Sequence, residues 1–105
     1  SMFDFIKKLF GGGPSVDLAA LIQGGAYLVD VRSKAEFSSG HVKGSVNIPL
    51  DTLASNLGKL KGKETIVVFC RSGNRSSMAK SLLEQNGFNN VVNGGSWHNV
   101  NQYVG

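Results

Sequence analysis

The chain has 105 residues, of which 41% are hydrophobic and 17% charged, and its formal net charge at pH 7 is +4. This length and composition predict one compact globular domain and exclude wholesale disorder. So small a charge, spread over scattered lysines and arginines, argues against a nucleic-acid-binding surface. The single cysteine excludes an intramolecular disulfide framework, and one Cys with two distant histidines does not form a metal-ligand set.

Membrane and export signals are also missing from the sequence. No stretch reaches the roughly 18 apolar residues that a membrane-spanning helix needs, and no signal peptide is visible. We therefore expect a cytoplasmic protein. Ser1-Met2 is typical of a cloning remnant, so this expectation leaves room for a natural leader that was removed.

Residues 1–14 are expected to form a short amphipathic helix followed by a glycine-rich linker. Phe3, Ile6 and Phe10 recur at helical spacing, and three consecutive glycines follow them. Such a helix either docks on its own domain, which we favour, or binds a membrane surface or a partner.

The domain proper is expected to span residues 15–105 and to alternate helices with strands. The first helix is predicted to begin at a Ser15 cap and to end at Gly24. The mostly apolar, β-branched run of residues 26–32 predicts a buried strand. The segment SKAEFSSGH then predicts a short helical turn capped by Ser33.

The second half of the chain continues this alternation. SVNIPL predicts a brief strand, and DTLASNLGKLKG predicts a helix that begins at an Asp51 cap. TIVVF is the strongest strand pattern, and NRSSMAKSLLEQNGF predicts a helix that buries Met78 and ends at Gly87. NVVN predicts the last strand, before a turn and a final helix. Strands that alternate with helices imply a mostly parallel sheet covered on both faces.

The candidate functional residues lie in the segment FCRSGNRSSMAK. Its cysteine, Cys70, follows the strongest predicted strand and precedes a predicted helix. Open α/β sheets bind ligands at such carboxyl ends, and a helix N-terminus stabilises anions and thiolates. Arg71 and Arg75 add positive charge, while Gly73 and Asn74 tolerate left-handed backbone, so the loop could turn its N–H groups toward the sulfur. We therefore interpret Cys70 as a reactive thiolate; the alternative is an inert core cysteine.

Other polar residues near the same sheet edge are interpreted as structural. Asp30 and Arg32 are expected to form an ion pair or loop-fixing hydrogen bonds, including Arg32 with Glu36 at helical spacing. His41 is expected to anchor a turn, and Trp97 to lie in the core or a pocket wall.

Three segments resemble the rhodanese family of sulfurtransferases. LVDVRSKAEFSSGHVKGSVNIP is similar to a characteristic segment of that family, and VVFCRSGNRSSMAKSLLEQNGF resembles its active-site strand, loop and helix. VVNGGSWHNV resembles the closing Gly-Gly-x-x-Trp region, with one spacer residue fewer before Trp97. The resemblance runs from about Val16 to the C-terminus and implies a three-layer rhodanese-like α/β domain.

The resemblance also implies an activity. Cys70 would accept a sulfane sulfur from a small anionic donor such as thiosulfate, become a persulfide, and pass the sulfur to cyanide, a thiol or a thioredoxin-like protein. No cofactor is implied. The residues expected to bind the substrate sulfur are those of the loop and the helix start: Arg71, Ser72, Gly73, Asn74, Arg75 and Ser76.

Two other functions stay open on sequence grounds. A non-catalytic rhodanese-type module would only bind a partner. A cysteine phosphatase places five residues between its cysteine and the arginine that grips the phosphoryl oxygens, whereas four separate Cys70 from Arg75 and Ser76 follows. The shorter loop favours sulfur over phosphorus, and arsenate reduction is a more remote alternative.

Overall fold

The computed structural model describes residues 17–105, so the helix and linker predicted for residues 1–14 lie outside the described residues, and this domain boundary stays a prediction. The described elements are, in chain order, α2 (Leu18–Gln23), β1 (Tyr27–Asp30), α3 (Lys34–Ser38), β2 (Val46–Asn47), the 3₁₀ helices η1 (Leu50–Ser55) and η2 (Leu57–Leu60), β3 (Ile66–Cys70), α4 (Asn74–Gln85), β4 (Val91–Ser96) and α5 (Trp97–Asn101).

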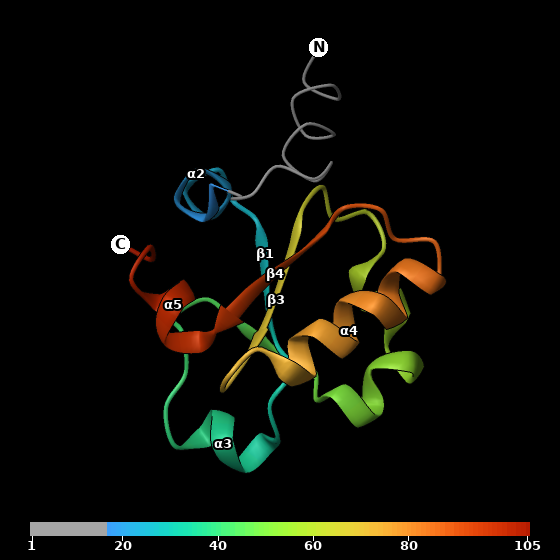
Figure 1. The fold of residues 1–105 in the computed structure, drawn as a ribbon, viewed down its shortest axis with the longest axis horizontal. Coiled ribbons are helices and arrows are strands. Elements are labelled where there is room, and N and C mark those ends of the chain that lie inside the picture. The colour runs from blue at the N-terminus through green and yellow to red at the C-terminus, as the bar shows by residue number, and fades with distance from the viewer. Residues whose placement is uncertain (1–16) are drawn as a thin grey trace.

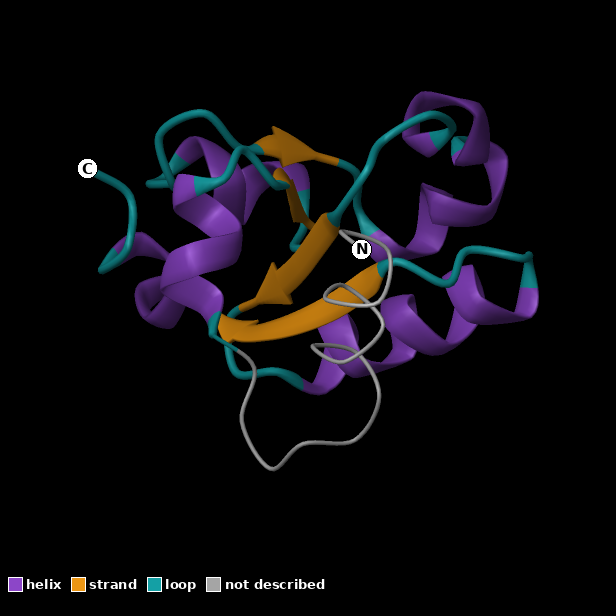
Figure 2. Cartoon of the chain, turned by 90° about the horizontal axis from the view of Figure 1, so that it is seen from above, coloured by secondary structure: helices purple, strands orange, loops and turns teal. Residues whose placement is uncertain are grey.

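The four strands form one parallel sheet in the order β2-β1-β3-β4. Helices cover both of its faces (Figures 1 and 2): α4 and the two 3₁₀ helices pack on one, and α2 and α5 on the other. The predicted α/β class, the parallel sheet and the three layers are thereby confirmed. Because parallel strands end at the same edge, residues that follow β1 and β3 meet there.

Two hydrophobic cores result from the alternation of side chains along the strands. Val29 and Val68 point into the α4-side core, whereas Leu28 and Val67 point into the core shared with α2 and α5. All five residues of β3 are buried. This strand therefore lies at the centre of the domain, and the residue that ends it, Cys70, is buried with it.

The 3₁₀ helices replace the single capped helix expected from Asp51. The residue before η1 is Pro49, and no side chain caps that end. Leu50 and Leu53, like Leu57 and Leu60, are three residues apart, so a helix with three residues per turn turns them toward the same core.

Two further expectations about helices were wrong. Asp17 caps α2 by accepting a hydrogen bond from the Ala20 N–H, whereas Ser15 lies outside the described residues. Met78 is 62% exposed, because the buried face of α4 runs through Ser76, Ala79 and Leu83 instead.

The last strand is longer than expected, because β4 continues through Gly94 and Gly95, where a turn was predicted, to Ser96. The other elements agree in type and order with the predicted ones. Between residues 17 and 105, no helix is long and apolar enough to cross a membrane.

Candidate active site

Cys70 is the last residue of β3, and its side chain faces the α4-side core with only 1% of the residue exposed. The chain turns through three residues and enters α4 at Asn74. This brings the N-terminal turn of α4 over the sulfur, where its N–H groups have no helical partners. Strand, loop and helix start thus place the only cysteine of the chain at the positive end of a twelve-residue helix.

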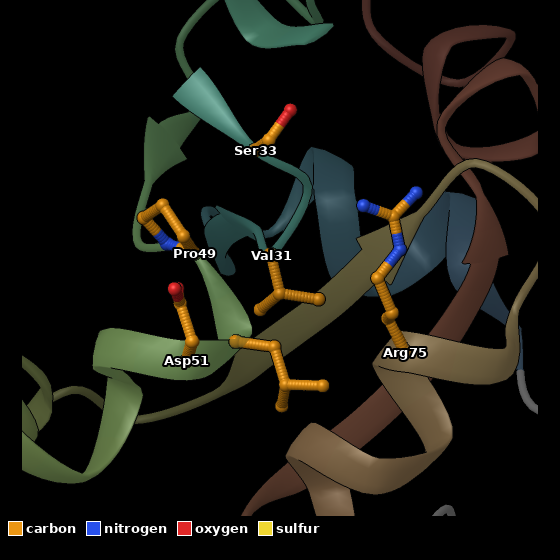
Figure 3. Close-up of a pocket in the computed structure, with 6 residues that line it drawn as sticks. Val31, Ser33, Pro49, Asp51 and Arg75 are labelled. Atoms are coloured by element: carbon orange, nitrogen blue, oxygen red, sulfur yellow. The ribbon is translucent and has the colours of Figure 1, made fainter. Parts of the chain in front are cut away.

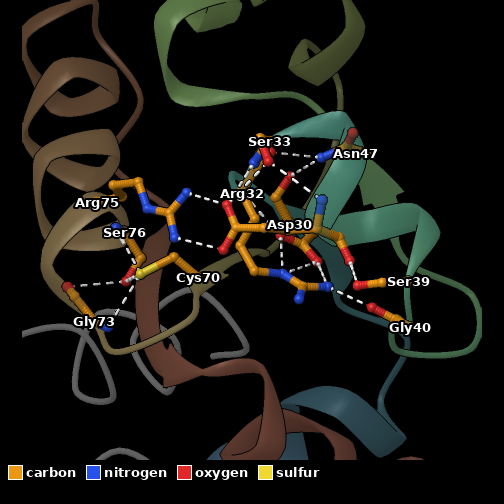
Figure 4. A network of polar contacts seen from close by, with 11 residues as sticks. Asp30, Arg32, Ser33, Ser39, Gly40, Asn47, Cys70, Gly73, Arg75 and Ser76 are labelled. Atoms are coloured by element: carbon orange, nitrogen blue, oxygen red, sulfur yellow. Dashed lines mark hydrogen bonds and ion pairs between the residues drawn. The ribbon is translucent and has the colours of Figure 1, made fainter.

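Backbone donors of the loop and helix start point at the sulfur (Figure 4). The Gly73 N–H lies 3.0 Å from Cys70 Sγ, and the Ser76 N–H lies 3.4 Å from it. Gly73 has a φ of +104°, which favours glycine and turns the chain so that its N–H faces inward. These donors form a cradle suited to a negatively charged sulfur.

Opposing effects act on the ionisation of Cys70. Burial raises the pKa of its thiol, but the contact with the Ser76 hydroxyl and hydrogen bonds from the backbone N–H groups of Ser76, Gly73 and Ser72 lower it more. The pKa of Cys70 therefore lies below its ordinary value. Among residues 17–105, no histidine or carboxylate is hydrogen-bonded to the sulfur, so the thiolate is favoured by donors rather than by a neighbouring base.

Ser76 forms the inner wall of the cradle and is fully buried. Its hydroxyl oxygen lies 3.5 Å from Cys70 Sγ, 3.0 Å from the Gly73 carbonyl oxygen and 2.7 Å from Asn93 Oδ1. Asn93 belongs to β4 and was missed by the sequence reasoning. Only its place beside the double glycine could have drawn attention to it.

The other predicted site residues surround this cradle at different depths. Arg71, Ser72 and Asn74 are exposed, whereas Gly73 and Arg75 are half-buried. The structure thus brings backbone groups of the loop onto the sulfur and leaves the side chains of three of its residues in solvent.

Arg75 is paired with Glu36 of α3, a residue that the sequence reasoning did not place in the site (Figure 4). Arg75 Nη1 donates to Glu36 Oε1 at 2.6 Å and Nη2 to Oε2 at 2.9 Å. Glu36 also accepts hydrogen bonds from the backbone N–H and hydroxyl of Ser33, the cap of α3. Hydrogen bonds from Arg75 and Ser33 lower the pKa of Glu36 from 4.5 to about 2 despite burial, and Glu36 raises that of Arg75.

Arg32 is paired with Asp30 rather than with Glu36, which corrects the expected partner. Arg32 Nη2 lies 2.7 Å from Asp30 Oδ2 and 2.7 Å from the Gly40 carbonyl oxygen, and its guanidinium stacks on Trp97 at 4.4 Å. Helical spacing did not apply, because α3 begins only at Lys34. The ion pair expected between Asp30 and Arg32 is present, and Trp97, expected in the core or a pocket wall, is partly buried against the core shared with α2 and α5.

His41 takes the anchoring role expected of it. Its Nδ1 lies 2.9 Å from the Phe37 carbonyl oxygen, and the two rings stack with centroids 3.9 Å apart. It is exposed and belongs to the turn after α3. In the part of the chain that the structure describes, no three His, Cys, Asp or Glu side chains cluster in a way that could hold a metal ion.

A hollow of about 300 Å³ borders the same sheet edge (Figure 3). It is lined by Val31, Ser33, Pro49, Leu50, Asp51 and Arg75. Val31 lies beside the end of β3, since its N–H donates to the Phe69 carbonyl oxygen and its side chain shares the α4-side core with Cys70. The hollow therefore offers mostly apolar space next to the Arg75–Glu36 pair and on the same face of the sheet as the cysteine.

Comparisons with known proteins agree on one family. The family model described as Rhodanese-like domain matches residues 15–101. The thiosulfate sulfurtransferase GlpE of Pseudomonas savastanoi pv. phaseolicola is 37% identical over 84 residues, which cover 78% of this chain and 79% of the relative. The structure of the human single-domain sulfurtransferase TSTD1 superposes with a TM-score of 0.69 at 31% identity, covering 84% of this chain and 95% of that one.

A longer relative is the putative sulfur carrier protein YrkF of Bacillus subtilis. It is 35% identical over 66 residues, which cover 63% of this chain. The match spans only 36% of the length of YrkF. This chain therefore spans most of the length of GlpE and TSTD1 but about a third of the length of YrkF, and what each name states applies to that protein.

Proposed function

The chain belongs to the rhodanese-like family of sulfurtransferases, and from this membership we propose that Cys70 carries a sulfane sulfur between a donor and a thiophilic acceptor. The observation that carries the proposal is the cradle: the Gly73 and Ser76 N–H groups point at Cys70 Sγ at a helix N-terminus. A persulfide anion needs such donors. It does not need an acid–base partner, and none contacts this sulfur in residues 17–105.

The proposed reaction has two displacement steps. The Cys70 thiolate attacks the outer sulfur of thiosulfate or of another persulfide donor, the sulfur–sulfur bond of the donor breaks, and sulfite or a thiolate leaves with the electron pair. The acceptor then attacks the outer sulfur of the Cys70 persulfide and restores the thiolate. Cyanide would leave as thiocyanate, and a thiol or thioredoxin-like protein would leave as a persulfide.

We further propose that the hollow beside Arg75 accepts the organic part of a donor or acceptor that carries carbon. The hollow beside Arg75 has Val31, Pro49 and Leu50 in its wall, so it suits an organic thiol or persulfide better than a bare anion. We propose a reducing compartment such as the cytoplasm for this chemistry, because the thiolate must stay reduced between cycles.

A phosphatase activity is disfavoured by the length of the loop after Cys70. A phosphoryl group needs a guanidinium for two of its oxygens, with five residues between that arginine and the cysteine, but only four residues separate Cys70 from Arg75, and Ser76 stands at the next position. An aryl phosphate should therefore not be hydrolysed at a rate above background.

Replacing the sulfur tests the proposal. We expect Cys70→Ser to reduce thiosulfate-to-cyanide sulfur transfer to the uncatalysed rate, while circular dichroism and thermal unfolding stay close to wild type. Ser77→Ala is a matched control, because Ser77 lies beside the cradle on α4 but is exposed. Equal turnover of Cys70→Ser and wild type would refute the assignment of the nucleophile.

A further inference from the structure

The Ser76 hydroxyl has one hydrogen and several possible acceptors. Asn93 Oδ1 lies 2.7 Å from its oxygen, the Gly73 carbonyl oxygen 3.0 Å, and Cys70 Sγ 3.5 Å. Because a hydroxyl donates only once, a hydrogen given to Asn93 is withheld from the sulfur. The partner of this hydroxyl therefore affects the charge that Cys70 can carry.

The orientation of the Asn93 amide is fixed by a backbone donor. The Gly95 N–H lies 2.9 Å from Asn93 Oδ1, and a backbone N–H can only donate, so this atom is the amide oxygen. The same oxygen faces Ser76 at 2.7 Å, and two oxygens approach that closely only with a hydrogen between them. Ser76 must then be the donor, and a lone pair of its oxygen is left facing Cys70.

A local irregularity in β4 creates this arrangement. Val68 pairs with Asn93 and Phe69 with Gly95, so Gly94 is an extra residue in β4. A Cβ atom on Gly94 would lie 2.7 Å from Val100 Cγ2, and Gly95 has a φ of +80°, so both positions favour glycine. The bulge thus places the Gly95 N–H on the Asn93 side chain.

We infer that Asn93 is a positioning residue that competes with Cys70 for the single hydrogen of the Ser76 hydroxyl. The neutral thiol is compatible with the Ser76–Asn93 hydrogen bond, because the thiol can donate its own hydrogen to the Ser76 oxygen. The thiolate is not stabilised by this arrangement, because a lone pair of the Ser76 oxygen faces it until the hydroxyl rotates and the hydrogen bond to Asn93 breaks. Asn93 therefore opposes the ionisation of Cys70, against the fixed donors Gly73 N–H and Ser76 N–H.

The charged groups around the cysteine stay the same when Asn93 is changed. On α4 and α3 these are Arg75 and Glu36, which are paired with each other, and on β1 and its following loop Asp30 and Arg32, also paired. Arg71 of the loop is exposed. An uncharged substitution of Asn93 thus changes the acceptor of the Ser76 hydrogen without adding or removing charge.

The inference takes Cys70 as the nucleophile proposed above, but its test needs no sulfur transfer. The pKa of Cys70 is measured from the pH dependence of alkylation by iodoacetamide and from thiolate absorbance. We expect Asn93→Ala to lower this pKa by about 0.5 to 1, the size of one neutral hydrogen bond. Ser76→Ala should raise the pKa of Cys70, because this variant has no hydroxyl that could donate a hydrogen bond to the thiolate.

The double variant distinguishes competition from a general loosening of the site. If Asn93 acts through Ser76, the pKa of Asn93→Ala/Ser76→Ala should equal that of Ser76→Ala alone. An Asn93→Ala pKa that is unchanged or raised, or a decrease that persists in the Ser76→Ala background, would overturn the inference.

If Asn93→Ala does not fold, Asn93→Asp provides a second test of the inference. Asn93→Asp keeps the shape and both acceptor contacts but binds the hydroxyl hydrogen more strongly, so the pKa of Cys70 should rise. The increase in the pKa of Cys70 caused by Asn93→Asp should be smaller when Ser76→Ala is also present. An increase of the same size with and without Ser76→Ala would contradict a competition for the Ser76 hydrogen. Failure of sulfur transfer in wild type would leave these alkylation results unaffected.

Discussion

Two arginine–carboxylate pairs lie at the carboxyl edge of the sheet, and they differ mainly in burial. In the Asp30–Arg32 pair the side chains are 0% and 4% exposed, and Arg32 also donates to the Gly40 carbonyl and stacks on Trp97. The Glu36–Arg75 pair is also bidentate, through Nη1 and Nη2 rather than Nε and Nη2, but its side chains are 30% and 36% exposed.

The difference suggests different roles for the two pairs. Breaking a buried pair leaves a charge without water or a partner, so the Asp30–Arg32 pair acts as a permanent part of the fold. Arg75 can exchange its partner at smaller cost, because water reaches and screens both members of this half-buried pair. We therefore regard Glu36 as a residue that restrains the positive charge beside the cradle, and the following predictions test this contrast.

The largest effect should come from breaking the buried pair. We expect Arg32→Met to lower the free energy of unfolding by roughly 3–5 kcal/mol, because Asp30 would remain buried without its partner. Urea unfolding measures the loss. Arg75→Met is the matched control and should cost less than about 1 kcal/mol. Similar losses in the two variants would mean that burial does not separate the pairs.

A smaller effect should appear in the use of the sulfur donor when the half-buried Glu36–Arg75 ion pair is removed. Glu36→Gln keeps the cap of α3, since glutamine also serves in a capping box, but it releases the charge of Arg75 toward an anion. We expect the KM for thiosulfate to fall by up to about fivefold, the equivalent of one exposed ion pair, with little change in kcat.

Glu84→Gln controls for the loss of a negative charge elsewhere on the protein. Glu84 forms an exposed pair with Lys80 on α4, so its removal should leave the KM for thiosulfate unchanged. A KM that is unchanged or higher in Glu36→Gln would show that Glu36 does not restrain Arg75.

The smallest effect concerns acid stability. The pKa of Glu36 is lowered to about 2 in the folded chain, chiefly by its hydrogen bonds with Arg75. Its contribution is thus present above the unfolded pKa near 4.5 and is lost as the pH falls toward 2. Urea midpoints should decrease less steeply in this window for Glu36→Gln than for wild type. Parallel pH profiles would contradict the role of Glu36.

The backbone part of the site could be predicted from the sequence because it depends on local patterns. A strand that ends at Cys70, a glycine three residues later and a helix directly after it dictate where the loop N–H groups point. Ser33 as the cap of α3 could be predicted for the same reason.

The side-chain partners could not be predicted, because they join residues that are distant in sequence. Glu36 and Arg75 are 39 residues apart, and Ser76 and Asn93 are 17 apart. The spacing between Arg32 and Glu36 even suggested a pair within one helix, but Arg32 precedes α3 rather than belonging to it. The exposure of Met78 likewise depends on which face of α4 meets the sheet.

The most direct test of the proposed function is the mass of the intact protein after incubation with thiosulfate, and separately with an organic persulfide. We predict a gain of one sulfur atom in wild type, its absence in Cys70→Ser, and its removal when cyanide is added. No adduct from either donor, or an adduct that Cys70→Ser retains, would contradict Cys70 as the sulfur carrier.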